Sequence, residues 1–128
     1  MQPACEMKNI PTSDTIQRAA DLILSSSSIV VFTGAGISTP SGIPDFRSEN
    51  NGLWTQSNPM EVASLTAFHH HPEKFFNWLR PLAAEIWKAA PNGAHYGLVE
   101  LEKAGFLRAV ITQNIDGLHR KAGSSEVV

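Results

Sequence analysis

Apolar residues recur along the chain with two different periods, which predicts alternating helices and strands. Between residues 13 and 25 they follow the spacing of one helical face, and Ser13 is a residue type that caps helix starts. Residues 29–32 and 107–111 are short apolar runs, as is typical of strands buried on both faces of a parallel sheet. Residues 33–57 are rich in Gly, Pro, Ser and Asn and predict a long loop, which at that length is usually functional.

Three further helices are predicted between the two strands. One begins with Asn58 as its cap, one runs from Glu73 to about residue 90 with a kink or split at Pro81, and one spans 93–104 with Gly105 ending it. The residues expected on their buried sides are Val62, Leu65 and Phe68, then Phe75, Phe76, Leu79, Leu82, Ala83 and Ile86, then Leu98 and Leu101. The order helix, strand, loop, helices, strand predicts an α/β fold that begins a parallel, doubly wound sheet with an insertion.

Composition places the chain among ordinary globular proteins. Its 128 residues suffice for one domain or part of one, and its net charge of −2 gives no general reason to expect nucleic acid or an anionic membrane as a partner. No apolar run approaches the roughly 18 residues that span a bilayer, and no signal-peptide pattern opens the chain, so we expect a cytoplasmic protein. The single cysteine, Cys5, excludes a disulfide or a cysteine-based zinc site within these residues.

The first strand is followed at once by Gly34-Ala35-Gly36. Glycines let the backbone approach a ligand closely, and backbone N–H groups at such a turn can hold a diphosphate. The spacing differs from the dinucleotide fingerprint, because the third glycine is Gly42, and the chain contains no P-loop motif. The glycines alone are therefore weak support for phosphate binding.

Residues 43–47, Ile-Pro-Asp-Phe-Arg, leave two interpretations open. In one, Arg47 pairs with phosphate and Phe46 covers a reactive centre and excludes water. In the other, the loop is anchored by Phe46 in the core, and Asp45 is hydrogen-bonded to backbone.

The second strand ends in Gln113-Asn114-Ile115-Asp116. Its amides and carboxylate match ribose hydroxyls and a carboxamide, although Asn, Asp and Gly are also ordinary turn residues. Ligands of open α/β sheets bind outside the carboxyl ends of parallel strands. We therefore expect this segment and the one at Gly34 to meet in one nucleotide-type crevice.

The histidines carry less information. Residues 69–71 are three consecutive histidines, which point in different directions on a helix and are expected to form a solvated helix end rather than a metal site. His95 is expected to cap or pack, and a catalytic role for His119 has no support in the sequence.

Together the polar segments resemble the motifs of the sirtuins, the NAD-dependent protein deacylases. Residues 34–47 match the family pattern GAGxSxxxGIPDFR throughout, and residues 112–116 match TQNID. Gly52-Leu53-Trp54 resembles the G-L-[WY] continuation of the family's cofactor loop. The resemblance covers about residues 15–128.

The resemblance implies a partial Rossmann-like parallel sheet with an inserted helical segment. It divides the chain into an irregular lead-in, 1–12, and the N-terminal part of a sirtuin catalytic domain, 13–128, with the cofactor loop and helical insertion in 48–90. The residues it assigns to NAD binding are Gly34, Ala35, Gly36, Ser38, Pro44, Asp45, Phe46, Arg47, Gln113, Asn114, Ile115 and Asp116. Within that set the glycines would line the diphosphate, Phe46 would shield the ribose C1′, and Asp116 would hold the carboxamide.

The resemblance also implies an activity, in which NAD is consumed, nicotinamide is released and the acyl group leaves an acyl-lysine protein or peptide. The general-base histidine of the family lies in an H-G motif, which the resemblance places beyond Val128, and the family's four zinc cysteines come later still. Neither is among these 128 residues, so we expect the sequence to end in mid-domain before the zinc module, with no catalytic or metal-binding residue of its own and no activity alone. The alternatives are a non-catalytic NAD-binding module and an inactive fragment.

Overall fold

Two parallel strands form the centre of the molecule. The computed structural model describes residues 12–49 and 52–128, and in it β1 (Ile29–Thr33) pairs with β2 (Leu107–Thr112) so that Thr33 lies beside Thr112. The other edge of β2 meets the end of the chain, where the Val110 N–H donates to the Glu126 carbonyl at 2.8 Å. Strand β2 is therefore covered on both edges, and Val110 is fully buried.

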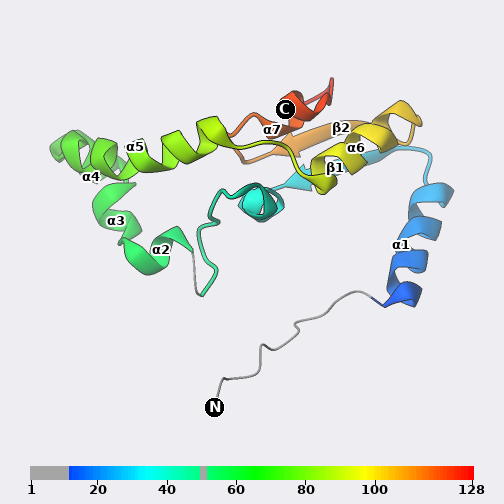
Figure 1. Ribbon diagram of the computed structural model, residues 1–128, viewed down its shortest axis with the longest axis horizontal. Helices are drawn as coiled ribbons and strands as arrows, with labels where there is room; N and C mark the ends of the chain where they lie inside the picture. Colours follow the sequence, from blue (N-terminus) through cyan, green and yellow to red (C-terminus); the bar gives the residue numbers. More distant parts are fainter. Residues whose placement is uncertain (1–11, 50–51) are drawn as a thin grey trace, which may run out of the picture.

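The described residues contain eight helices besides this sheet, and several of them lie well to either side of it (Figure 1). They are α1 (Ser13–Ser25), the 3₁₀ helix η1 (Ala35–Ser41), α2 (Leu53–Gln56), α3 (Pro59–Val62), α4 (Leu65–His70), α5 (Pro72–Lys88), α6 (Gly93–Lys103) and α7 (Leu118–Ala122). Helix α6 packs against β2 and α7, whereas α3, α4 and α5 contact one another at the far end of the molecule. None of the described helices is long and apolar enough to cross a membrane.

The predicted parallel α/β arrangement is confirmed, but the long loop is not irregular throughout. Residues 33–57 contain η1 and α2, which are too short to produce a visible hydrophobic period. Helix η1 ends at Gly42, whose φ of 87° lies in the left-handed region that glycine adopts readily. The cap of α1 is Thr12 rather than Ser13, and the rest of the predicted lead-in, 1–11, lies outside the described residues.

The helix predicted from Asn58 is two helices. Asn58 caps α3 as expected, but the Ser64 hydroxyl accepts the Ala67 N–H at 3.0 Å and starts α4 afresh. A serine that caps a new helix competes with continuation of the old one. The resulting turn leaves Leu65 79% exposed and Phe68 38% exposed, so the predicted burial of these two residues is wrong.

Of the predicted kink or split at Pro81, the split is wrong, because α5 is one helix across that position. A proline removes only one backbone donor, and Leu79 and Leu82 on either side of it are half-buried. The predicted buried face is right for Phe75, Leu79, Leu82 and Ile86, which are half-buried, but wrong for Phe76 and Ala83, which are exposed.

Helix α6 begins and ends as predicted but turns a different side inward. Asn92 and His95 form a reciprocal cap at its start, and Gly105 follows its end with a φ of 82°. Val99 and His95 are its buried residues, while Leu98 and Leu101 are half-buried. The orientation is set by α7 and β2, which α6 covers.

Candidate nucleotide-binding site

The two polar segments meet directly, because they leave paired strands at the same edge. The Gln113 N–H donates to the Thr33 carbonyl at 3.0 Å, which extends the strand pairing by one residue. One residue further, the Asn114 amide donates to the Gly34 carbonyl, also at 3.0 Å. The expectation that the carboxyl ends of the strands form one crevice is confirmed by these contacts.

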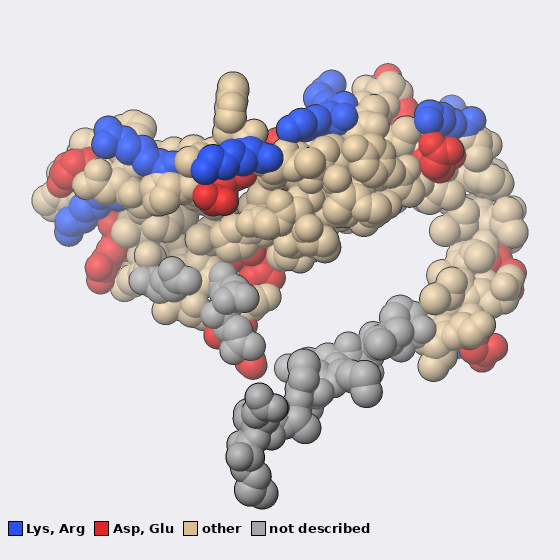
Figure 2. Space-filling view, in the orientation of Figure 1, with Lys and Arg blue, Asp and Glu red and all other residues tan. Residues whose placement is uncertain are grey.

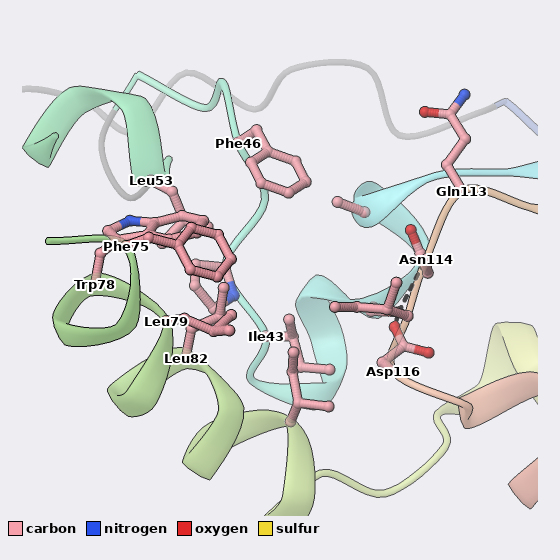
Figure 3. Close-up of a pocket in the computed structure, with 15 residues that line it drawn as sticks. Ile43, Phe46, Leu53, Phe75, Trp78, Leu79, Leu82, Gln113, Asn114 and Asp116 are labelled. Carbon is pink, nitrogen blue, oxygen red and sulfur yellow. Dashed lines mark hydrogen bonds between the residues drawn. The ribbon is translucent and has the colours of Figure 1, made fainter. Parts of the chain in front are cut away.

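Ser38, Asn114 and Asp116 form a small hydrogen-bonded group that borders the crevice, and Figure 3 labels Asn114 and Asp116 there. The hydroxyl of the fully buried Ser38 donates to Asp116 Oδ2 at 2.6 Å and accepts from the Asn114 amide at 3.3 Å. The second carboxylate oxygen of Asp116 accepts the Leu118 N–H at 2.9 Å, at the start of α7. These two hydrogen bonds fix the Asp116 carboxylate in place. Because each carboxylate oxygen has more than one lone pair, Asp116 can still accept a hydrogen bond from a ligand.

Residues 45–48 and 52–54 are joined to each other by backbone hydrogen bonds. The N–H groups of Leu53 and Trp54 donate to the carbonyls of Asp45 and Phe46 at 2.8 and 3.0 Å. The Asp45 carboxylate accepts from the hydroxyl and the N–H of Ser48, and these bonds lower the pKa of Asp45. Asp45 therefore has the turn-stabilising role that one of the two interpretations gives it.

Phe46 is not a core anchor. It is 40% exposed, and its ring packs on Trp54 with 5.2 Å between ring centroids. Trp54 in turn stacks on Trp78 of α5 at 5.7 Å. Trp54 thus packs on Phe46, while the Phe46 ring borders the crevice, where Figure 3 labels it.

The crevice consists of two adjoining cavities. One, of about 450 Å³, is bordered by the backbone of residues 34–36 together with Asp45, Arg47 and Trp54. The other, of about 240 Å³, is mostly apolar and lies between α5 and residues 113–116. Three residues border both: Ala35, Phe46 and Gln113.

All twelve residues assigned to NAD binding from the sequence border one of these two cavities. Apart from its own neighbours in the chain, a Cβ atom added at Gly34 or Gly36 would meet no atom of residues 12–49 and 52–128 within 4 Å, so the space beside that backbone is open to a ligand. The sequence predicts only core packing for the apolar wall from α5, which includes Trp78, Leu79, Leu82 and Ile86. Apolar residues have the same helical spacing whether they pack in a core or line a cavity, so no sequence pattern could have identified this wall.

His95 and His119 border neither of these two cavities, although His119 borders a third cavity beside Asn114 and Asp116. Their side chains are 0% and 2% exposed, with 4.9 Å between ring centroids. Burial lowers the pKa of both, and His119 lowers that of His95 further, while Asp116 acts in the opposite direction. His95 caps α6 as predicted, whereas the depth of His119 was not evident from the sequence.

Val128 runs alongside β2 at one side of the polar segment 113–116. The Thr112 N–H donates to the Val128 carbonyl at 2.8 Å, and the Val128 N–H donates to the Val110 carbonyl at 2.9 Å. Val128 also borders a further cavity of about 270 Å³, together with Asn114 and Asp116. The placement of the family's general-base histidine beyond Val128 concerns residues outside this sequence, so it stays a prediction.

Charge on the rest of the surface is mixed. On the face shown in Figure 2, Lys and Arg side chains lie among Asp and Glu side chains instead of gathering by sign. The histidines 69–71 end α4 and are exposed, as expected of a solvated helix end. Within residues 12–49 and 52–128, no group of three or more His, Cys, Asp or Glu side chains is placed to hold a metal ion.

The family model described as the Sir2 family matches residues 34–128, which include both polar segments. The chain belongs to the Sir2 family. The sirtuin resemblance of the two motifs is thereby confirmed.

Curated Sir2 relatives are similar over nearly the whole chain. A protein named NAD-dependent protein deacetylase 2 from Caldanaerobacter subterraneus subsp. tengcongensis is 49% identical over 116 residues, which are 91% of this chain and 46% of the relative. NAD-dependent protein deacylase 2 from Archaeoglobus fulgidus is 49% identical over 90% of this chain and 45% of its own length. The chain thus spans less than half the length of the Sir2 relatives that it matches.

Solved Sir2 structures share the fold. A Sir2 homologue–NAD complex superposes with a TM-score of 0.76 at 42% identity, covering 88% of this chain and 43% of that chain. A Sir2 complex with deacetylated p53 peptide and 3′-O-acetyl ADP-ribose superposes with a TM-score of 0.83 at 44% identity, covering 88% and 45%.

Proposed function

We propose that this Sir2 chain supplies the NAD-binding part of the site of an NAD-dependent protein-lysine deacylase. The observation that carries the proposal is the meeting of residues 34–47 and 112–116 around two joined cavities. Relatives at 49% identity are named NAD-dependent deacetylases and deacylases, and the solved neighbours include complexes with NAD and with acetylated peptide.

The residues that line each of the two cavities are chemically suited to a different part of NAD. The open backbone at Gly34 and Gly36, with Arg47 on the same cavity, suits a diphosphate, because N–H groups and a guanidinium bind phosphate oxygens. The apolar cavity that ends at Asp116 suits a flat ring with a carboxamide, whose N–H groups need an acceptor. NAD, when bound, supplies the ADP-ribosyl group that receives the acyl group as nicotinamide leaves.

Other residues of this chain would position these groups and exclude water. Ser38 and the Leu118 N–H hold the Asp116 carboxylate in one orientation, so that its remaining lone pairs point at a fixed place. Phe46, backed by Trp54, would cover the reacting centre. Ile115 is 83% exposed at the edge of the apolar cavity, where a bound ring would bury it.

The test uses the longest natural form of the protein with NAD and an acetyl-lysine peptide. We expect nicotinamide release that depends on the peptide, and exchange of labelled nicotinamide into NAD. Asp116→Asn should impair that exchange far more than it lowers stability, since its amide can still bond to Ser38 and the Leu118 N–H but loses acceptor capacity. Asp21→Asn, an exposed change on α1, is the matched control. Unchanged exchange in Asp116→Asn would remove that residue from the site.

A further inference from the structure

His95 and His119 are the two large polar side chains buried under the site. They come from the first turns of α6 and α7 and border neither of the two NAD cavities. His95 Nε2 and His119 Nδ1 are both buried and have no hydrogen-bond partner in the described part of the chain. A buried unpaired imidazole nitrogen costs free energy, so two such atoms on neighbouring rings require an explanation.

The partners of each ring fix its tautomer. The Asn92 backbone N–H can only donate, and it donates to His95 Nδ1 at 3.2 Å. In the neutral ring the proton of His95 is therefore on Nε2, which makes Nε2 an unpaired donor.

The same reasoning gives the complementary result for His119. The Thr33 hydroxyl uses its one proton toward Thr112 Oγ1 at 2.9 Å, so it accepts from His119 Nε2, also at 2.9 Å. The proton of neutral His119 is then on Nε2, and Nδ1 is an unpaired acceptor. One ring thus lacks an acceptor and its neighbour lacks a donor.

We propose that His95 Nε2–H donates to His119 Nδ1, and that this neutral pair acts as a positioning element beneath the site. A direct N–H···N bond of about 3 Å places two imidazole centres about 5 Å apart, and the observed separation is 4.9 Å. A small rotation of either ring completes the bond.

The pair closes a chain of polar contacts between the two polar segments. At one end, the Asn92 amide that precedes α6 donates to the Ile37 carbonyl at 2.8 Å and to the Ser41 hydroxyl at 2.9 Å, both on η1. At the other end, Thr112 Oγ1 accepts the Asn114 N–H at 3.1 Å. The diphosphate side and the carboxamide side of the crevice are therefore connected through His95 and His119.

The wild-type protein labelled with ¹⁵N tests the pairing without reference to NAD. Two-bond ¹H–¹⁵N correlation spectra at about pH 7.5 should show both rings neutral with the proton on Nε2. The His95 Nε2 proton should exchange with water far more slowly than that of the exposed His69. A proton on Nδ1 of either ring, a cationic ring, or rapid exchange at His95 would overturn the proposal.

Thr33→Val tests the positioning role. It removes the acceptor of His119 Nε2–H, which frees the proton to move to Nδ1 and deprives His95 of its acceptor. We expect the His95 proton to exchange at least about tenfold faster and ADP-ribose to bind about tenfold more weakly. Thr66→Val, at an exposed position on α4, should change neither.

The two proposals fail in different ways, although the ADP-ribose measurement rests on the proposed function. If the variant loses the pair but binds ADP-ribose like the wild type, the positioning role is refuted. If the wild type binds no ADP-ribose, the proposed function fails, and the wild-type spectra still decide the pairing. The spectra also decide it if Thr33→Val does not fold.

Discussion

The sharpest prediction concerns Gly52, because its hydrogen atom occupies a place that no larger group can enter. A Cβ atom at this position would lie 2.6 Å from both the N and the O of Ser48 and 2.9 Å from the carbonyl carbon of Arg47. All three are backbone atoms, which cannot rotate away. The φ of Gly52 is −65°, which alanine adopts without strain, so the whole effect of Gly52→Ala comes from this contact.

The size of the effect follows from the bonds that the clash would open. The Gly52 N–H donates to the Ser48 carbonyl at 2.8 Å, and Leu53 and Trp54 donate to Asp45 and Phe46. Each such bond contributes about 0.5–1.5 kcal/mol net, so the bonded arrangement of residues 45–48 and 52–54 should lose about 2–4 kcal/mol. That is roughly a thirtyfold to a thousandfold loss of this arrangement relative to one in which the three bonds are open.

The assay compares Gly52→Ala with Gly97→Ala. Outside its own helix backbone, an added Cβ at Gly97 in α6 meets no atom of the described part of the chain within 4 Å, and replacing a helical glycine by alanine stabilises by about 0.5–1 kcal/mol. We expect Gly52→Ala to speed amide hydrogen exchange at Leu53 and Trp54 and to weaken ADP-ribose binding, and Gly97→Ala to raise the free energy of unfolding. Equal exchange rates in Gly52→Ala and wild type would refute the steric argument.

The remaining predictions concern the buried polar groups and turnover. Ser38→Ala should lower the free energy of unfolding by about 1–3 kcal/mol in urea titrations, because the half-buried Asp116 carboxylate loses a donor; no change would mean that water replaces the hydroxyl. Asn92→Ala should cost about 2 kcal/mol in the same titrations, since a helix cap and two contacts with η1 disappear together, and a loss under about 0.5 kcal/mol would contradict this. Burial lowers the pKa of His95 and His119 in the folded state, so the unfolded chain binds protons more readily, and stability should fall as the pH drops below about 6.5; rising stability on acidification would contradict it. Residues 1–128 alone should release no nicotinamide from NAD with acetyl-lysine peptide. His119, the histidine nearest the polar segment 112–116 in the sequence, is buried and hydrogen-bonded to Thr33, so it is not free to act as the general base. Turnover that His119→Ala abolishes would show that His119 is the base.

Local signals in the sequence predicted the strands, the starts of α3 and α6 and the glycine that ends α6. Such features depend on residues within a few positions of each other, as with Asn58, Asn92 and Gly105. The same locality explains the errors. Ser64 caps a new helix, but the same residues are also compatible with one continuous helix, so the local sequence does not show the break. Likewise, the hydrophobic period of α5 does not show that Phe76 faces solvent.

The sequence by itself determined that the segments at Gly34 and Gln113 meet, because a strand that ends in a polar motif places that motif at a known edge of a parallel sheet. The rest of the candidate set came from the sirtuin resemblance, and all twelve candidate residues border the two cavities. Only the tertiary structure decided which of them hold one another, as Ser38 and Asp116 do, and that His95 and His119 share a buried space. These contacts join residues separated by 78 and 24 positions. Which side chains meet across such separations depends on how α6 and α7 pack on β2, and no local pattern encodes that packing.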